Sequence, residues 1–312
     1  MPSFDRNRGN NSSQMMPKLR TLVLTVLLVL PLGSLPVESA STPAVPAFSH
    51  IFVIIMENRE FGEVVNTSQA PFIAKLARDY AVANPYYAVT HPSLPNYIAL
   101  TGGDTFGITD DCTDCPVTGE NLADQVEAHQ RTWKAYMEGL PTACFLGSSS
   151  GAYAKKHNPF VYYTNIATNP ARCRQVVPLS EFNTDLSRGT VPDLAWITPD
   201  MCHSMHDCET GEGDRWLAAI VPKVLASRAW RDGGVLFATW DEGTSEAGCC
   251  GKPGGGKVAM LAISPLSWRG YRSNTESNHY ALLRTIEDAW SLGHLRHAGD
   301  AQTPVLADLF QR

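Results

Sequence analysis

Three apolar runs of this chain are followed, directly or within three residues, by acidic or amide side chains. Each run is four to six residues long, and IFVIIM is rich in β-branched residues, which is typical of a strand buried on both faces. The runs IFVIIM, LAWI and VLFATW are followed, in this order, by Glu57 and Asn58, by Asp200, and by Asp241 and Glu242. One acid after a strand is ordinary, because polar residues often end strands. Three such strand ends in one chain predict a shared site.

Helical segments separate these runs. Residues 70–81, 120–139 and 214–227 have helical patterns, and residues 258–264 form a fourth strand-like run. Strands that alternate with helices predict an α/β fold, with a mostly parallel sheet covered by helices on both faces. The ligand site of such a sheet lies beyond the carboxyl ends of its strands. Clustered carboxylates repel one another unless a cation or a proton intervenes, so the sequence predicts a divalent metal with oxygen ligands.

The N-terminal segment has the pattern of an export signal. Lys18 and Arg20 precede a short apolar run, and small residues follow it. This pattern predicts a secretory signal peptide over residues 1–40, with an uncleaved anchor as the alternative. We expect a short tether at residues 41–49, a single domain at residues 50–312, and no stable membrane span in the mature protein. The expected location is therefore outside the cell, in the periplasm or at the cell envelope.

The composition excludes some classes of partner and indicates the compartment of the protein. The net charge of −6 offers no basic surface for nucleic acid or for an anionic membrane. Eight cysteines, an even number in an exported chain, favour disulfide bonds, although the CTDC segment at residues 112–115 also resembles half of a zinc site. Because Cys249 and Cys250 are adjacent, we expect them to pair with different partners. The rest of the connectivity stays open.

A nucleophile candidate lies in the segment THPSLPNYIALTGG. Pro95 fits the first turn of a helix, where its missing N–H group costs nothing. Ser93 is then expected near the N-cap, beside free backbone N–H groups and the positive end of the helix dipole, which is a favourable place for phosphate. The alternative is that Ser93 only caps the helix, as serine often does.

A second serine competes for the same role. Ser149 lies in GSSSG, which matches the G-x-S-x-G elbow of serine esterases, and Ser149, Asp241 and His279 follow the required order along the chain. The elbow needs a helix after it, but Asn158 and Pro159 follow within a few residues. This interpretation also leaves Glu57, Asn58 and Glu242 without a role, so we hold the esterase as the weaker alternative.

Histidines supply candidates for proton transfer and phosphate binding. Those beside turn or helix-start signals are His157, His203, His206 and His279. Cys202 and Cys208 flank two of them and are expected to hold that loop rigid. His294 and His297 have no such context, and we interpret them as structural.

These motifs together resemble one known family. HIFVIIMEN, THPSLPNYIALTGG, KHNPFVYY, ITPDMCHSMHDC, WDEG and NHYALLRTIED occur in the order expected of the secreted phosphoesterase family. That family contains acid phosphatases and bacterial phospholipases C and belongs to the alkaline phosphatase superfamily. The resemblance runs over about residues 50–309 and implies an alkaline-phosphatase-like fold. Related sulfatases carry arginine where this chain has Tyr97, which argues against sulfate esters.

The resemblance implies a role for each matching residue. The implied catalytic residues are Ser93, His206 and His279. The implied substrate-binding residues are His91, Asn96, His157, Asn158 and His203. The implied metal ligands are Glu57, Asn58, Ser93, Asp241 and Glu242, with Asp200 as a further candidate.

The expected activity is metal-dependent hydrolysis of phosphomonoesters through a phosphoserine, as in acid phosphatases. The metal is Ca²⁺, Mg²⁺, Mn²⁺ or Zn²⁺, and one or two ions are compatible with the sequence. A phospholipase C that cleaves phospholipid head groups is the main alternative. A binding protein that has kept the fold but lost catalysis is a third, although Ser93 and the acids of WDEG are retained. The oligomeric state stays open.

Overall fold

The computed structural model describes residues 45–251 and 254–311. The expected signal peptide and the first residues of the expected tether lie outside this part of the chain. The described residues belong to one compact unit. Phe48, at the end of the expected tether, is buried, and its carbonyl accepts a 2.7 Å hydrogen bond from Trp290 Nε1.

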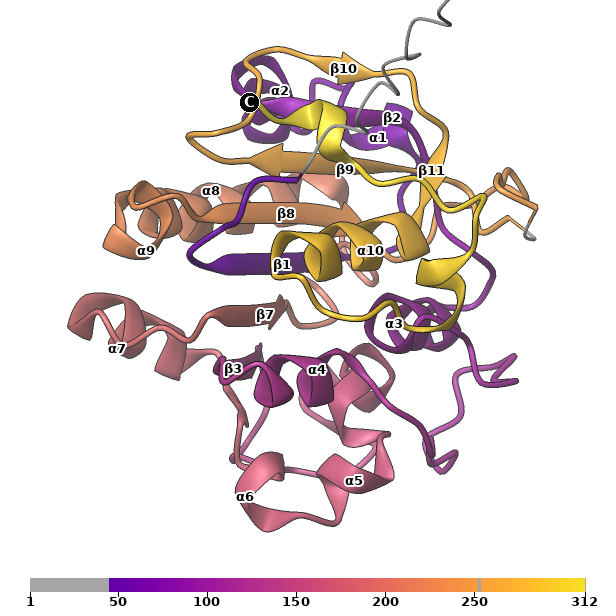
Figure 1. Cartoon of the computed structure of the whole chain (residues 1–312), viewed down its shortest axis with the longest axis vertical. Helices are drawn as coiled ribbons and strands as arrows, with labels where there is room; N and C mark the ends of the chain where they lie inside the picture. Colours follow the sequence, from indigo (N-terminus) through magenta and orange to yellow (C-terminus); the bar gives the residue numbers. More distant parts are fainter. Residues whose placement is uncertain (1–44, 252–253, 312) are drawn as a thin grey trace, which may run out of the picture. The chain divides into compact units, whose positions relative to one another are not determined.

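A nine-stranded sheet forms the centre of this unit (Figure 1). Its strands are β1 (Ile51–Met56), β2 (Ala81–Tyr87), β3 (Trp133–Met137), β6 (Val176–Pro178), β7 (Leu194–Thr198), β8 (Val235–Trp240), β9 (Lys257–Ile263), β10 (Arg272–Ser273) and β11 (Ser277–Asn278). The order is β10-β2-β9-β8-β1-β7-β3-β6, and β11 also pairs with β2. The run from β8 to β6 is parallel, whereas β9 is antiparallel to both β8 and β2. The predicted mostly parallel α/β fold is confirmed.

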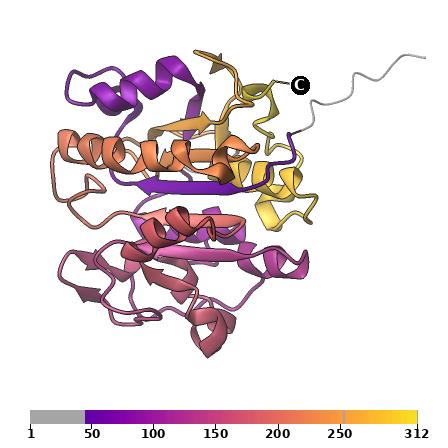
Figure 2. The same ribbon diagram turned by 90° about the vertical axis from the view of Figure 1, so that its left-hand side faces the viewer.

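Helices cover both faces of the sheet, with α8 and α10 on opposite sides (Figures 1 and 2). The helices are α1 (Phe61–Val64), α2 (Pro71–Asp79), α3 (Ser93–Gly102), α4 (Leu122–Ala128), α5 (Thr164–Ala167), α6 (Pro170–Cys173), α7 (Ser180–Arg188), α8 (Thr210–Ala226), α9 (Arg228–Arg231) and α10 (His279–Ala289). Short 3₁₀ turns are η1 (Lys155–His157), η2 (Pro159–Val161), η3 (Arg296–Gly299) and η4 (Ala307–Leu309). A separate hairpin joins β4 (Ser149–Ser150) to β5 (Tyr153–Ala154). No helix among the described residues is long and apolar enough to cross a membrane.

The predicted helix over residues 120–139 is wrong in its second half. Helix α4 ends at Ala128, Gln130 has a left-handed φ of 58°, and the chain then enters β3. Strand β3 lies between β7 and β6 and is largely buried. Pairing on both sides therefore overrides the helical pattern of this segment.

The cysteines pair within short distances along the chain. The disulfides are Cys112–Cys115, Cys144–Cys173, Cys202–Cys208 and Cys249–Cys250. The CTDC segment is thus closed by a disulfide. The expectation of separate partners for Cys249 and Cys250 is wrong, because a turn with φ of 62° at Cys250 accompanies a bond between the two neighbours.

The register of the central strands positions the acidic residues. Met56 at the end of β1 is the partner of Trp240 at the end of β8, and Asp241 N–H donates to Met56 O at 2.9 Å. Glu57 and Asp241, the next residues of the two strands, therefore leave the sheet side by side.

Candidate active site

Three carboxylates meet Ser93 at the carboxyl ends of β1 and β8. The hydroxyl of Ser93 donates to Glu57 Oε2 at 3.0 Å and lies 3.3 Å from Glu242 Oε1. Glu57 and Asp241 are fully buried, and Ser93 is only 1% exposed. The structure therefore brings together Ser93 and the acids of two of the three strand ends.

Burial and mutual repulsion raise the pKa values of these carboxyls. Burial raises the pKa of Glu57 to about 7, although hydrogen bonds from Tyr97 and Ser93 oppose the shift. Burial, followed by the charges of Glu57 and Glu242, raises the pKa of Asp241 well above its usual range. Burial also raises the pKa of Glu242. Asp241 Oδ2 is buried without a hydrogen-bond partner among the described residues. Several buried oxygen donors, one of them unsatisfied, fit a hard divalent cation.

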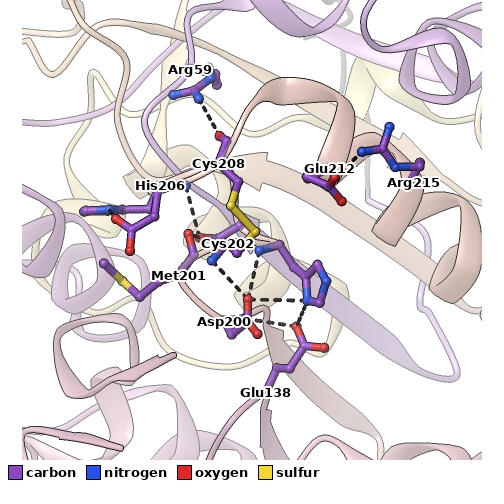
Figure 3. Close-up of a disulfide and its surroundings, with 12 residues drawn as sticks. Arg59, Glu138, Asp200, Met201, Cys202, His206, Cys208, Glu212 and Arg215 are labelled. Atoms are coloured by element: carbon purple, nitrogen blue, oxygen red, sulfur yellow. Dashed lines mark hydrogen bonds and ion pairs between the residues drawn. A yellow bond between two sulfur atoms is a disulfide. The ribbon is translucent and has the colours of Figure 1, made fainter. Parts of the chain in front are cut away.

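Asn58 completes the turn at the end of β1. Its φ of 54° is left-handed, a conformation that asparagine tolerates better than most residues. The backbone N–H of Asn58 donates to Asp241 Oδ1 at 3.2 Å. The next residue, Arg59, donates to Asn58 O and to Cys208 O, both at 2.9 Å, and so ties this turn to the loop closed by Cys202 and Cys208 (Figure 3).

Two histidines lie on another side of Glu57. His157 Nε2 is 3.2 Å from Glu57 Oε1, and the His157 ring stacks on Tyr97 with 5.4 Å between ring centroids. Tyr97 donates to the same Glu57 oxygen at 2.5 Å. Ligand atoms of Glu57, His157 and His206 lie within 4.8 Å of one another, close enough for this group to hold a metal ion. Burial, with the charges of Lys156 and His206, lowers the pKa of His157 well below its usual range, so this ring is neutral near neutral pH.

Ser93 lies next to the N-cap of α3, as predicted, and does not cap the helix itself. Pro92 is the N-cap and Ser93 is the first helical residue. The N–H of Leu94 is not free, because it donates to Asp111 Oδ1 at 3.0 Å. The other oxygen of Asp111 accepts from Lys156 Nζ at 2.8 Å, and Lys156 Nζ lies 3.1 Å from His206 Nε2.

His91 and His279 contact the acidic residues from outside the cluster. His91 Nδ1 pairs with Glu242 Oε2, and His91 Nε2 donates to Ser245 O at 3.1 Å. His279 Nε2 donates to Asp241 O at 2.6 Å, and its Nδ1 accepts from Tyr86 at 3.1 Å. Burial lowers the pKa of His279 to about 4, against the hydrogen bond to Asp241 O, which raises it. Both rings therefore hold acidic residues in place in this arrangement.

The two asparagines predicted to bind substrate have structural contacts. Asn96 accepts from Val89 N–H and Thr90 N–H and donates to the carbonyls of Thr90 and Pro92, which fixes the loop before Ser93. Asn158 is fully buried and donates to the Tyr153 hydroxyl at 3.0 Å. Asn96 thus shapes the site through the backbone.

Asp200 and His203 belong to a second group, together with Glu138. Their ligand atoms lie within 4.8 Å of one another, and His203 Nδ1 is 3.0 Å from Glu138 Oε2. Asp200 Oδ1 accepts from the backbone N–H groups of Cys202 and His203, at the start of the disulfide-closed loop (Figure 3). The contacts of Asp200 therefore order the loop that carries His206.

The rival serine lacks the geometry of an esterase elbow. Ser149 is exposed and begins the short strand β4, which turns directly into β5. A 3₁₀ turn, η1, follows in place of the required helix. The GSSSG segment is a hairpin.

Several residues of this site were absent from the predicted set. Tyr97 contacts Glu57, Asp111 and Lys156 join α3 to His206, and Glu138 joins the second group. Lys156 directly precedes His157, and Asp111 directly precedes the first cysteine of CTDC, which are the sequence signals that point to them.

The sequence matches a known family profile and curated relatives. The profile of the Phosphoesterase family matches residues 63–293. The chain is 31% identical over 281 residues to the phosphatidylinositol-3-phosphatase of Mycobacterium tuberculosis, covering 89% of this chain and 88% of the relative. It is 29% identical over 264 residues to a probable acid phosphatase of Kluyveromyces lactis, covering 82% of this chain and 61% of that longer relative.

A solved structure shares the fold. A protein in the alkaline phosphatase superfamily from Vibrio parahaemolyticus superimposes with a TM-score of 0.55 at 14% sequence identity, covering 83% of this chain and 72% of that chain. A likeness at this level of identity shows the fold. Two groups of side chains among the described residues could each hold a metal ion, Glu57 with His157 and His206, and Glu138 with Asp200 and His203.

Proposed function

The chain belongs to the phosphoesterase family and is a phosphoric ester hydrolase, and from that premise we propose that it is a secreted, metal-dependent acid phosphatase. It hydrolyses phosphomonoesters through a phosphoserine formed on Ser93. The observation that carries this proposal is the place of the Ser93 hydroxyl, in hydrogen-bond distance of both Glu57 and Glu242 where β1 and β8 end. The disulfides fit an oxidising compartment and so support export.

Oxygen donors at the ends of β1 and β8 would hold the metal. The residues that fit are Glu57, Asn58, Ser93, Asp241 and Glu242. When bound, a divalent metal supplies positive charge that polarises a phosphoryl oxygen and makes the Ser93 hydroxyl more acidic. The unsatisfied Asp241 Oδ2 and the raised pKa values of the three carboxyls support this assignment.

Each side chain of the site has a separate role in the proposed reaction. Glu57 accepts the hydrogen bond of Ser93 and is placed to take its proton as Ser93 attacks phosphorus. His206, which is partly exposed, protonates the departing alcohol. In the second step a water molecule attacks phosphorus and gives a proton to His206. The bond between phosphorus and the Ser93 oxygen breaks, and Glu57 returns its proton to Ser93. His279, whose ring nitrogens hold Asp241 O and Tyr86, acts by positioning Asp241.

Access to Ser93 favours a terminal phosphoryl group. Ser93 is nearly inaccessible, whereas His91 and His206 at the rim are 30% and 22% exposed. A phosphomonoester presents a small terminal group, while a phosphodiester must fit a substituent on both sides of phosphorus. The Mycobacterium tuberculosis relative is named for a monoester phosphate on a lipid head group, so we include such lipids among the substrates.

Three substrates separate the possible activities. We expect the protein to release phosphate from p-nitrophenyl phosphate and from the 3-position of phosphatidylinositol 3-phosphate, because both carry a phosphomonoester. We expect no release of phosphocholine from a phosphatidylcholine emulsion. The measurement is product release by the purified mature protein. Cleavage of phosphatidylcholine with inactivity on both monoesters would establish the phospholipase C alternative.

A further inference from the structure

Asp111 and Lys156 contact the helix of Ser93 and His206, and the proposed metal site gives neither of them a role. Resting on the proposed phosphoryl transfer, we propose that Lys156 binds the phosphoryl group of the substrate beside Ser93. Asp111 is the positioning residue that holds Lys156 there.

Asp111 connects Lys156 to the helix that carries the nucleophile. One carboxylate oxygen of Asp111 accepts the N–H of Leu94, the residue after Ser93, at 3.0 Å. The other oxygen accepts from Lys156 Nζ at 2.8 Å. Because one rigid carboxylate makes both bonds, the position of the ammonium group is fixed relative to the first turn of α3. The disulfide of Cys112 and Cys115 closes the loop directly after Asp111.

Lys156 also reaches the histidine proposed to protonate the leaving group. Its Nζ lies 3.1 Å from His206 Nε2, while His206 Nδ1 contacts Asp207 at 2.7 Å. An ammonium group has only donors, so His206 Nε2 accepts from it in the substrate-free arrangement. Once Lys156 binds the phosphoryl group, Nε2 is released to carry the proton that His206 gives to the leaving alcohol. The ammonium group of Lys156 thus lies between the rim histidine and the carboxylate attached to the nucleophile helix. Its side chain is 19% exposed, which leaves a path for a substrate.

The negative charge of the site favours an additional cation beside the substrate. Glu57, Asp241 and Glu242 carry more negative charge together than one divalent metal neutralises. A phosphoryl dianion adds further negative charge, and a fixed ammonium group offsets it. The neighbouring histidines are less suited to the task, because His91 is paired with Glu242 and His157 is buried against Glu57 and Tyr97.

Lys155 provides a matched control beside Lys156 in the same 3₁₀ turn η1. Lys155 Nζ donates to Thr113 O at 2.7 Å and lies 4.8 Å from the centre of the Tyr162 ring. These contacts direct its charge to the loop 112–115 and away from His206. Both lysines carry the same charge, so a comparison separates a specific contact from a general loss of positive charge.

The experiment uses the metal-loaded mature protein and its variants Lys156→Met, Lys156→Gln, Lys156→Arg, Asp111→Asn and Lys155→Met. Calorimetry measures the Kd of inorganic phosphate, and steady-state kinetics measure KM and kcat on p-nitrophenyl phosphate. Melting curves show which variants are folded. Lys156→Gln keeps a polar side chain without the charge, so it serves if Lys156→Met does not fold.

Loss of the charge at Lys156 should raise the Kd of phosphate and the KM roughly 10- to 100-fold, the usual effect of losing a charged hydrogen bond. Lys156→Arg should recover part of the affinity, Asp111→Asn should weaken it in the same direction, and Lys155→Met should leave it unchanged. Wild-type affinity for phosphate in the folded Lys156→Met or Lys156→Gln protein would overturn the inference, as would a wild type that does not bind phosphate. A wild type that binds phosphate but does not hydrolyse phosphomonoesters contradicts the proposed function alone.

Discussion

Replacing Asp241 with asparagine is expected to abolish metal binding and hydrolysis, and yet to stabilise the metal-free protein above neutral pH. Asp241 is fully buried, and its Oδ2 has no partner among the described residues. Its pKa is raised well above the usual range by burial and by the charges of Glu57 and Glu242. Without a cation, the ionised Asp241 therefore destabilises the folded state. Asparagine removes that charge at nearly constant volume.

The sign of the pH dependence follows from the direction of these shifts. Burial raises the pKa of Glu57 from 4.5 to about 7 in the folded protein, so the folded state holds a proton that the unfolded chain releases. The free energy of unfolding of the metal-free wild type therefore falls as the pH rises from about 4.5 to about 7. Each unit of raised pKa corresponds to about 1.4 kcal/mol, so the Glu57 shift alone amounts to roughly 3 kcal/mol above this range.

The measurement is the melting temperature of the metal-free wild type and of Asp241→Asn at about pH 5 and about pH 8. The variant should melt higher than the wild type at the upper pH, with a smaller difference at the lower pH. Asp232→Asn, on an exposed carboxylate paired with Arg228, is the control and should change little. An Asp241→Asn protein that still binds metal, or that melts lower at the upper pH, contradicts this account.

Replacing Ser93 with alanine should reduce kcat on the order of 10⁴- to 10⁶-fold, as other nucleophile deletions do. The hydroxyl of Ser93, which lies beside Glu57 and Glu242, is the proposed nucleophile, and no second hydroxyl is proposed to replace it. The measurements are kcat on p-nitrophenyl phosphate and the mass of the peptide containing residue 93 after rapid acid quench. The wild-type peptide should carry one phosphate group, and the alanine variant none.

Ser149→Ala is the matched control for this prediction. Ser149 lies exposed in the β4–β5 hairpin, so its loss should leave kcat unchanged. If Ser149→Ala removes the activity and Ser93→Ala does not, the esterase alternative is correct. Phosphate trapped on a residue other than Ser93 would also contradict the assignment.

The position of the acids was predictable because it depends on a strong and simple signal. Buried parallel strands read as continuous apolar runs, and their carboxyl ends share one edge. Glu57 and Asp241 therefore follow from the ends of two such runs, and the register Met56–Trp240 places them side by side. Strand β9 runs antiparallel to β8, but the two strands that carry these acids, β1 and β8, are parallel neighbours.

The contacts that complete the site depend on packing that a sequence pattern does not contain. Asp111 and Lys156 are 45 residues apart and meet only through tertiary structure. The free N–H expected beside Ser93 is occupied for the same reason, because Asp111 comes from a distant loop. The strand Trp133–Met137 was missed because pairing with β6 and β7 determines its conformation more than its local pattern does.

The most direct test of the account is hydrolysis of p-nitrophenyl phosphate by the purified mature protein before EDTA treatment, after it, and after divalent metal is restored. We expect EDTA to abolish the activity and one of Ca²⁺, Mg²⁺, Mn²⁺ or Zn²⁺ to restore it, because the three buried carboxylates around Ser93 fit a divalent cation. Full activity in protein shown by elemental analysis to be free of metal would contradict the account. Asp241 and Glu242 would then only end a strand.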